Sequence, residues 1–71
     1  MKKDIENLAK LIAKNNNNST HAHVATWVNE IQKQTERGFS LSRIFALVNN
    51  WFKFSSEELV PHNLDDKLRG R

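Results

Sequence analysis

The side chains best suited to chemistry are three histidines and two pairs of adjacent acids. His21 and His23 lie two residues apart, and His62 is far along the chain. Residues two apart do not share a helix face, and neither a cysteine nor an acid at a zinc-like interval completes a ligand set. We therefore expect no metal ligands and treat the histidines as ordinary polar residues.

The acidic pairs Glu57–Glu58 and Asp65–Asp66 resemble a catalytic acid and base only superficially. Adjacent carboxylates on a helix diverge, and a small helical domain has little room for the concave pocket that shifts their pKa values. The sequence contains no Gly-rich phosphate loop, no nucleophile elbow and no H-E-x-x-H motif. We predict no catalytic residues, no cofactor and no enzymatic activity.

Two tryptophans and four phenylalanines are more aromatic residues than a minimal core of this size needs. We expect Trp27, Phe45 and Phe52 to fill the core. Trp51 and Phe54 lie near the end of a predicted helix and at the edges of its apolar arc, where we expect partial exposure.

Aromatic residues are enriched at binding hot spots, so this region is the predicted docking surface for a protein partner. A partner groove, or a second copy of the chain, would receive the apolar side chains, with two basic residues at the rim. The predicted partner-binding residues are Leu47, Trp51, Phe54, Arg43 and Lys53.

A second hypothesis is a DNA-binding helix-turn-helix over residues 30–50, with Gly38 in the turn. The match is partial, because Lys33, Gln34 and Arg37 occupy positions where the first helix of that motif usually has apolar or small residues. Arg and Lys neutralise phosphates, and Arg and Asn read base edges. The predicted nucleic-acid-binding residues are Lys33, Arg37, Ser42, Arg43, Asn49, Asn50 and Lys53.

Length and charge narrow the class of protein. A chain of 71 residues with net charge +3 predicts one domain with a modest core, and no window carries dense Lys/Arg clustering. The chain lacks cysteine, has no apolar run near the roughly 18 residues of a membrane span, and has Asp4 and Glu6 where a signal peptide would be apolar. We expect a cytoplasmic protein with no membrane partner.

Apolar periodicity predicts the elements that position these residues. Ile5, Leu8, Ala9 and Ile12 form one stripe of a helix over 3–14, which the Asn15–Asn18 run ends. Ser19 or Thr20 caps a second helix over 20–37, which stops at Gly38.

Ser40 caps a third, central helix over 41–53, whose apolar arc is too wide for packing against one neighbour. Ser55 and Glu58 have capping-box spacing, with Phe54 placed to staple onto Leu59, which predicts a short helix over 56–60 before Pro61. Residues 61–71 are expected to form a partly ordered tail.

The predicted fold class is therefore all-α, a small bundle of three main helices plus a short C-terminal helix. The predicted function is protein interaction, as a regulator, inhibitor or adaptor of a larger assembly. Two alternatives stay open: a homodimer, and a chain that folds fully only on its partner.

Overall fold

The computed structural model describes residues 2–70, and its regular secondary structure over that range is entirely helical. Three long helices, α1 (Lys2–Asn15), α2 (His21–Glu36) and α3 (Leu41–Phe54), are followed by a 3-10 turn, η1 (Pro61–Asn63), and the short α4 (Leu64–Leu68). The predicted all-α class, with three main helices and a short C-terminal helix, is confirmed.

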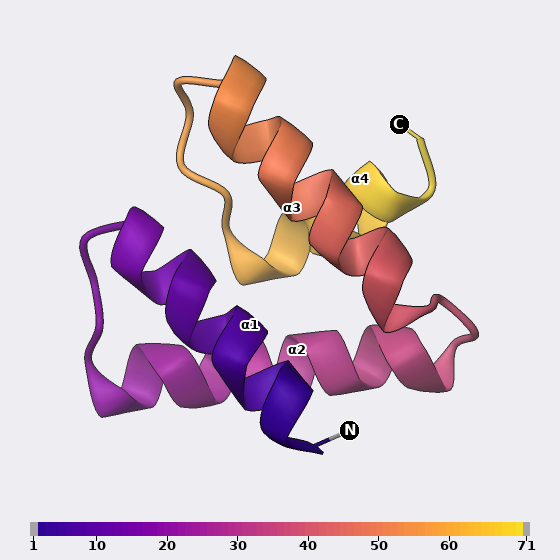
Figure 1. Cartoon of the computed structure of the whole chain (residues 1–71), viewed down its shortest axis with the longest axis horizontal. Helices are drawn as coiled ribbons and strands as arrows, with labels where there is room; N and C mark the ends of the chain where they lie inside the picture. The colour runs from indigo at the N-terminus through magenta and orange to yellow at the C-terminus, as the bar shows by residue number, and fades with distance from the viewer. Residues whose placement is uncertain (1, 71) are drawn as a thin grey trace.

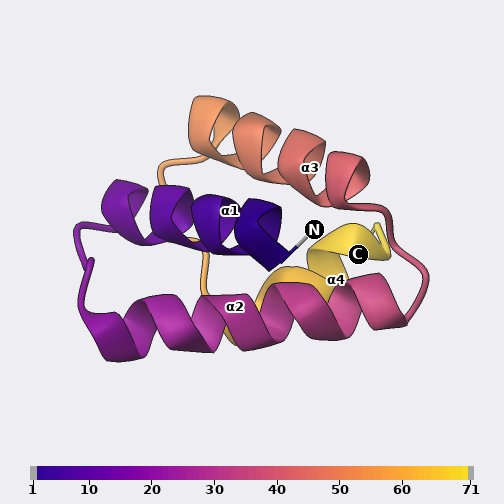
Figure 2. The ribbon, with the colours of Figure 1, turned by 60° about the horizontal axis from the view of Figure 1, so that its bottom comes forward.

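The helices form a flattened molecule, 28 × 27 × 18 Å along its principal axes. α1 and α3 run side by side in the same direction, and α2 crosses below them (Figure 1). In the turned view, α4 lies between α2 and α3 (Figure 2), where α4 contacts α3 and η1 contacts α2. Among residues 2–70, no helix is both long and apolar enough to cross a membrane.

Capping side chains and one glycine set the helix ends where the sequence predicts them. The Thr20 hydroxyl accepts a hydrogen bond from the backbone N–H of His23 at 3.3 Å, and the Ser40 hydroxyl accepts one from Arg43 at 3.2 Å. Gly38 has a φ of +102°, the left-handed conformation that commonly ends a helix. The predicted caps and the Gly38 turn are confirmed.

The core is built from one apolar stripe of each helix together with the C-terminal segment. The stripe predicted for α1 is buried, and Trp27 of α2 is fully enclosed as predicted. Phe52 packs against this core while partly buried. The side chains that form the core are Ile5, Leu8, Ala9, Ile12, Trp27, Ile31, Ile44, Val48, Leu59, Leu64 and Leu68.

The structure has no helix at residues 56–60, so that prediction is wrong. Residues 55–60 are irregular, and the Ser55 hydroxyl accepts from the backbone N–H of Glu57 at 3.2 Å, in a local turn that replaces the expected capping box. The Trp51 indole N–H donates to the Glu57 carbonyl at 3.0 Å. A five-residue helix makes too few internal hydrogen bonds to form without tertiary support, and here the tertiary contacts favour the turn.

The Phe54–Leu59 staple is wrong for the same reason. Leu59 is fully buried in the core, whereas Phe54 is 82% exposed at the end of α3. The Asn16 side-chain amide donates to the Leu59 carbonyl at 2.8 Å. The irregular backbone therefore lets Leu59 reach the core beside the end of α1.

Residues 61–68 are more regular than the predicted tail, because Leu64 and Leu68 are core residues. Arginines hold this segment in place. The Asp65 carboxylate oxygen Oδ1 lies 3.0 Å from Arg37 Nη1 and 3.1 Å from Arg69 Nε. Arg43 Nη2 donates to the Leu68 carbonyl at 2.9 Å. α4 is thus fastened both to the end of α2 and to the start of α3.

Asp65 predicts a pH dependence of stability. Desolvation raises the pKa of its carboxyl, but the guanidinium groups of Arg69 and Arg37 lower this pKa by more than desolvation raises it. The pKa of Asp65 therefore lies below the ordinary value of 3.8. A group whose pKa is lower in the folded state stabilises the fold above its unfolded pKa, and that stabilisation disappears as pH falls through the folded pKa. We expect Asp65→Asn to be less stable than wild type at pH 6, with the difference shrinking below about pH 4.

Urea unfolding of both proteins, followed by circular dichroism at pH 6, 5, 4 and 3, measures that difference. Asp66→Asn, which changes an exposed neighbouring carboxylate, is the matched control and should show a smaller difference at pH 6. If the difference in free energy of unfolding between wild type and Asp65→Asn stays constant over the whole pH range, the ionised Asp65 carboxylate is not the source of the stabilisation.

Candidate protein-binding surface

An apolar groove of about 490 Å³ lies between α1 and α3. We call it the α1/α3 groove. Its volume is in the range of pockets that bind small ligands. Its lining residues are Leu8, Leu11, Leu41 and Phe45, with Asp4, Asn7 and Ser42 as the polar members.

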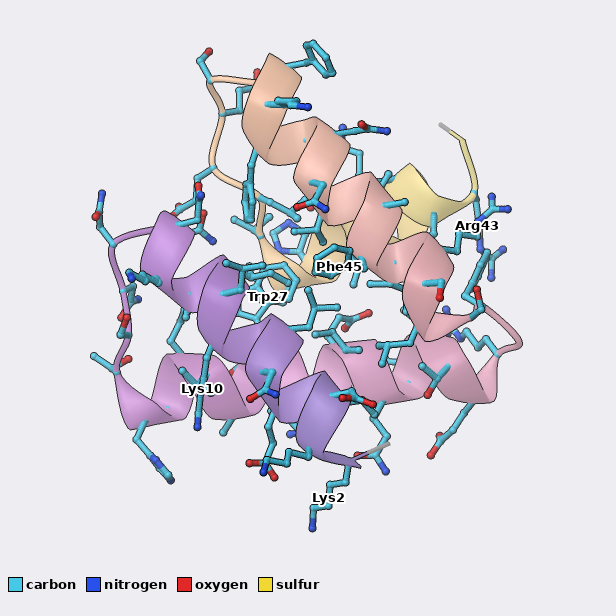
Figure 3. The ribbon with its side chains drawn as sticks, in the orientation of Figure 1. Lys2, Lys10, Trp27, Arg43 and Phe45 are labelled. Atoms are coloured by element: carbon cyan, nitrogen blue, oxygen red, sulfur yellow. The ribbon has the colours of Figure 1, made fainter. Side chains whose placement is uncertain are left out.

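Two of the lining residues expose large apolar surfaces. Leu11 is 38% exposed on α1, and Phe45 is 46% exposed on α3. Figure 3 shows Phe45 lying between the two helices. Leu8 is nearly buried and links the groove to the core. The groove is therefore an opening beside the core at which apolar side chains meet solvent.

The prediction that Phe45 fills the core is wrong. Ile44 and Val48, four residues apart on α3, occupy the buried face of the helix and are fully enclosed. Phe45 follows Ile44 by one residue, a rotation of about 100° around the helix axis. This rotation carries the ring out of the core and towards α1.

Sequence reasoning also missed Leu11 as a surface residue. Leu11 lies outside the stripe that buries Ile5, Leu8 and Ile12, which is a signal available in the sequence. The wide apolar arc of α3 is the matching signal on the other side of the groove. What the sequence did not show is that these two surplus apolar strips lie side by side.

The predicted partner-binding residues do not form a single surface. Leu47 is partly buried against the core. The Trp51 ring is half-buried, with its indole N–H bonded to Glu57 and Lys67 Nζ 4.2 Å from the ring centroid. Phe54 alone points its ring freely into solvent. Trp51 therefore holds the segment that follows α3, and it contributes less free surface than Phe45.

Of the two predicted rim residues, one is engaged in contacts within the molecule and the other is free. Arg43 bonds to the Leu68 carbonyl and has its guanidinium carbon 5.5 Å from the centroid of the Phe39 ring. Lys53 is exposed near the end of α3. Arg43 is thus engaged with α4, and Lys53 is the freer cation.

The predicted nucleic-acid-binding residues are divided between two helices that α4 separates (Figure 2). Lys33 Nζ lies 3.7 Å from Glu30 Oε1 on the same helix, and Arg37 pairs with Asp65. On α3, Ser42 lines the α1/α3 groove. Arg43 is engaged with α4, as described above. The remaining members are exposed on α3, and they are Asn49, Asn50 and Lys53.

The histidines and acidic pairs lie apart from this surface. His23 accepts a hydrogen bond from the Trp27 indole, and His62 is in η1. Within residues 2–70, no group of three His, Cys, Asp or Glu side chains is close enough to hold a metal ion.

No family model, no curated protein and no solved structure matches this chain. The chemistry of the molecule's own surface is therefore the ground for assigning a function. Three large apolar side chains are exposed among residues 2–70, and two of them, Leu11 and Phe45, line the α1/α3 groove.

Proposed function

We propose that this chain is a small protein-interaction module that acts by docking a partner in the α1/α3 groove, and not by catalysis. The observation that carries the proposal is the pairing of the half-exposed Phe45 ring with the exposed Leu11 side chain across one groove. The proposed partner is a larger protein assembly, which the module regulates or bridges. For a chain without cysteine, we propose the reducing cytoplasm as the compartment.

Solvent exposure of these side chains is costly, and docking removes that cost. Each square ångström of apolar surface withdrawn from water contributes about 25 cal/mol, so a partner that covers both side chains gains affinity there. The three polar lining groups, Asp4, Asn7 and Ser42, give the groove an orienting rim. An apolar centre with a polar edge is the usual anatomy of a protein interface.

Selection of peptides from a displayed random library tests this function. We expect the wild-type protein to enrich binders that lose about tenfold or more in affinity when the protein carries Phe45→Ser. The substitution should cost only about 1 kcal/mol of stability because the ring is half-exposed. Leu11→Ser provides an independent second lesion on the facing helix.

Phe54→Ser is the matched control, since it removes an exposed phenylalanine outside the groove from the same helix. Enriched peptides that are insensitive to Phe45→Ser and Leu11→Ser but lose affinity with Phe54→Ser would move the docking site to the end of α3. Failure to enrich any binder would overturn the proposal.

DNA binding is the competing function, and it predicts a different response to salt. Phosphate-driven affinity falls steeply between about 50 mM and 200 mM salt. Fluorescence anisotropy with mixed duplex DNA over that range, on wild type and Phe45→Ser, separates the two functions. Salt-sensitive binding that is unaffected by Phe45→Ser would favour the nucleic-acid hypothesis.

A further inference from the structure

We propose that a hollow on another side of α1, between that helix and the start of α2, binds an organic phosphate. We call it the α1/α2 hollow. It has a volume of about 410 Å³ and is lined by Lys10, Lys14, Ser19, His21 and Val24. A second hollow of about 450 Å³ adjoins it and shares Lys10, His21 and Val24 with it. Neither has a lining residue in common with the α1/α3 groove.

Basic side chains from two helices meet at the α1/α2 hollow. Lys10 and Lys14 are four residues apart on α1 and therefore share one face of that helix, and His21 is the first residue of α2. Figure 3 shows Lys10 extending from α1 on the side of α2. Neither lysine belongs to an ion pair within residues 2–70, and none of the lining residues in that range is acidic. The positive charge therefore lies at the hollow itself and has no paired counter-charge.

The position of these lysines is electrostatically unfavourable in the free protein. Two like charges at positions i and i+4 of a helix repel each other. The positive end of the α2 dipole lies at the same hollow, and the first turn of α2 contains no acidic residue to neutralise it. The dipole of α1 accounts for Lys14 in its last turn, but not for Lys10. A bound anion would offset these repulsions together.

The hydrogen-bond donors of the hollow suit a phosphate better than a carboxylate. The lining offers two ammonium groups, the Ser19 hydroxyl and the His21 ring. Within residues 2–70, neither the Ser19 hydroxyl nor the His21 ring takes part in a side-chain hydrogen bond. A phosphate group carries about −1.5 to −2 charges at pH 7 and three strong acceptor oxygens. A carboxylate, with one charge and two oxygens, would leave part of this donor set unused.

The adjoining hollow has room for an apolar body next to the phosphate. Val24, Ala25 and Val28 line it, and the two valines are half-buried against the core. An apolar ring that lies on these side chains withdraws their surface and its own from water, which favours binding. The two hollows together therefore match a phosphate that is attached to an organic group better than they match a free phosphate ion.

Acidic residues confine the basic region to one end of the space between α1 and α2. Glu6 lines the adjoining hollow, and Glu36 lines the next hollow along α2. A nucleic acid binds through several phosphates in succession and needs a continuous basic track. The interruption by Glu6 and Glu36 favours a ligand with a single phosphate over a nucleic acid.

Titration of the full-length protein with phenyl phosphate, followed by two-dimensional NMR of the backbone amides, tests the site. We expect a Kd of about 1 mM or lower, with larger signal shifts for the residues that line the α1/α2 hollow than for those that line the α1/α3 groove. Inorganic phosphate lacks the ring, and phenylacetate lacks the phosphate. We expect each of them to bind about fivefold or more weakly than phenyl phosphate.

Substitution of the lysines assigns the binding to the hollow. Lys10→Gln and Lys14→Gln should each weaken phenyl phosphate about threefold or more, and the double variant about tenfold. Lys3→Gln removes an exposed lysine of the same helix that does not line the hollow, and this matched control should keep the wild-type affinity. Phe45→Ser should keep it as well, because Phe45 lines the separate groove. Circular dichroism verifies that each variant retains the wild-type helicity.

A phosphotyrosine peptide and uridine monophosphate distinguish the two sources of such a ligand. Both carry one phosphate on a body that contains a ring. Tighter binding of the peptide would support a phosphate carried by a protein, and tighter binding of the nucleotide would support a free small molecule.

Several outcomes would overturn the proposal. Absence of binding at about 10 mM phenyl phosphate would do so, as would binding that Lys10→Gln and Lys14→Gln leave unchanged. Equal affinity for phenylacetate would remove the selectivity for phosphate, and equal affinity for inorganic phosphate would remove the organic body. Tighter binding of mixed duplex DNA that depends on Lys10 and Lys14 would identify a polyanion instead. None of these outcomes changes the expected docking in the α1/α3 groove.

Discussion

Leu64→Ala is expected to lower the free energy of unfolding by about 2–5 kcal/mol. Leu64 is fully buried and starts α4, which lies between α2 and α3. Truncating its side chain removes apolar burial and leaves a cavity where three elements meet. A chain of this length has a total stability of only about 4–10 kcal/mol, so this one change removes a large part of it.

Urea denaturation followed by circular dichroism measures this loss, with Asp66→Ala as the control in the same short helix. Asp66 is exposed, and surface substitutions usually change stability by about 0.5 kcal/mol or less. Equal and small effects of the two substitutions would mean that the C-terminal segment is no more than the partly ordered tail predicted from the sequence, and not a part of the core.

His23→Ala is expected to cost about 1–3 kcal/mol of stability, although His23 is on the outward side of the apolar stripe in the sequence. The fully buried Trp27 donates its indole N–H to His23 Nε2 at 3.2 Å. An imidazole nitrogen that accepts is unprotonated, so this contact requires the tautomer with its proton on Nδ1. Without the imidazole, a buried donor loses its partner.

His21→Ala is the matched control, because His21 is an exposed histidine in the same first turn of α2. A double-mutant cycle with Trp27→Phe isolates the hydrogen bond, since phenylalanine has no N–H to leave unpaired. The expected cost of His23→Ala is smaller in the Trp27→Phe background. An equal cost in both backgrounds would show that His23 acts through packing alone.

The helix boundaries were predictable because the signals that set them are local. Thr20 and Ser40 bond to backbone groups three residues away, and Gly38 needs only its own left-handed conformation. The α1 stripe and the burial of Trp27 follow from spacing along a single helix. Such features depend on residues within one or two turns of one another.

The irregular segment at 55–60 was not predictable from the same kind of signal. Its capping-box spacing is a local preference that favours a helix, but Leu59 gains burial in the core only if the backbone departs from helical geometry. The bonds from Asn16 and Trp51 to this segment join it to α1 and α3. Tertiary contacts outweighed a weak local propensity.

The sequence predicted one part of the candidate site, the apolar surplus of the third helix, but not which of its residues is exposed. The wide apolar arc on residues 41–54 indicates surplus apolar surface on the third helix, and this surplus is present. The residue assigned to it changed: Trp51 is held by Glu57 and Lys67, and Phe45 is the ring that reaches solvent beside Leu11. Which part of a wide arc is covered depends on where the neighbouring helices lie.

The sequence by itself therefore determined the helical class, the three long helices, their caps and the excess of apolar residues on the third. Each of these depends on backbone hydrogen bonding and on periodicity within one segment. Only the tertiary structure decided that α4 lies between α2 and α3, that Arg37 and Arg43 are engaged in holding it, and that α1 and α3 leave a groove between them. These features arise from contacts between residues far apart in the chain, and no local pattern encodes which surfaces such contacts cover.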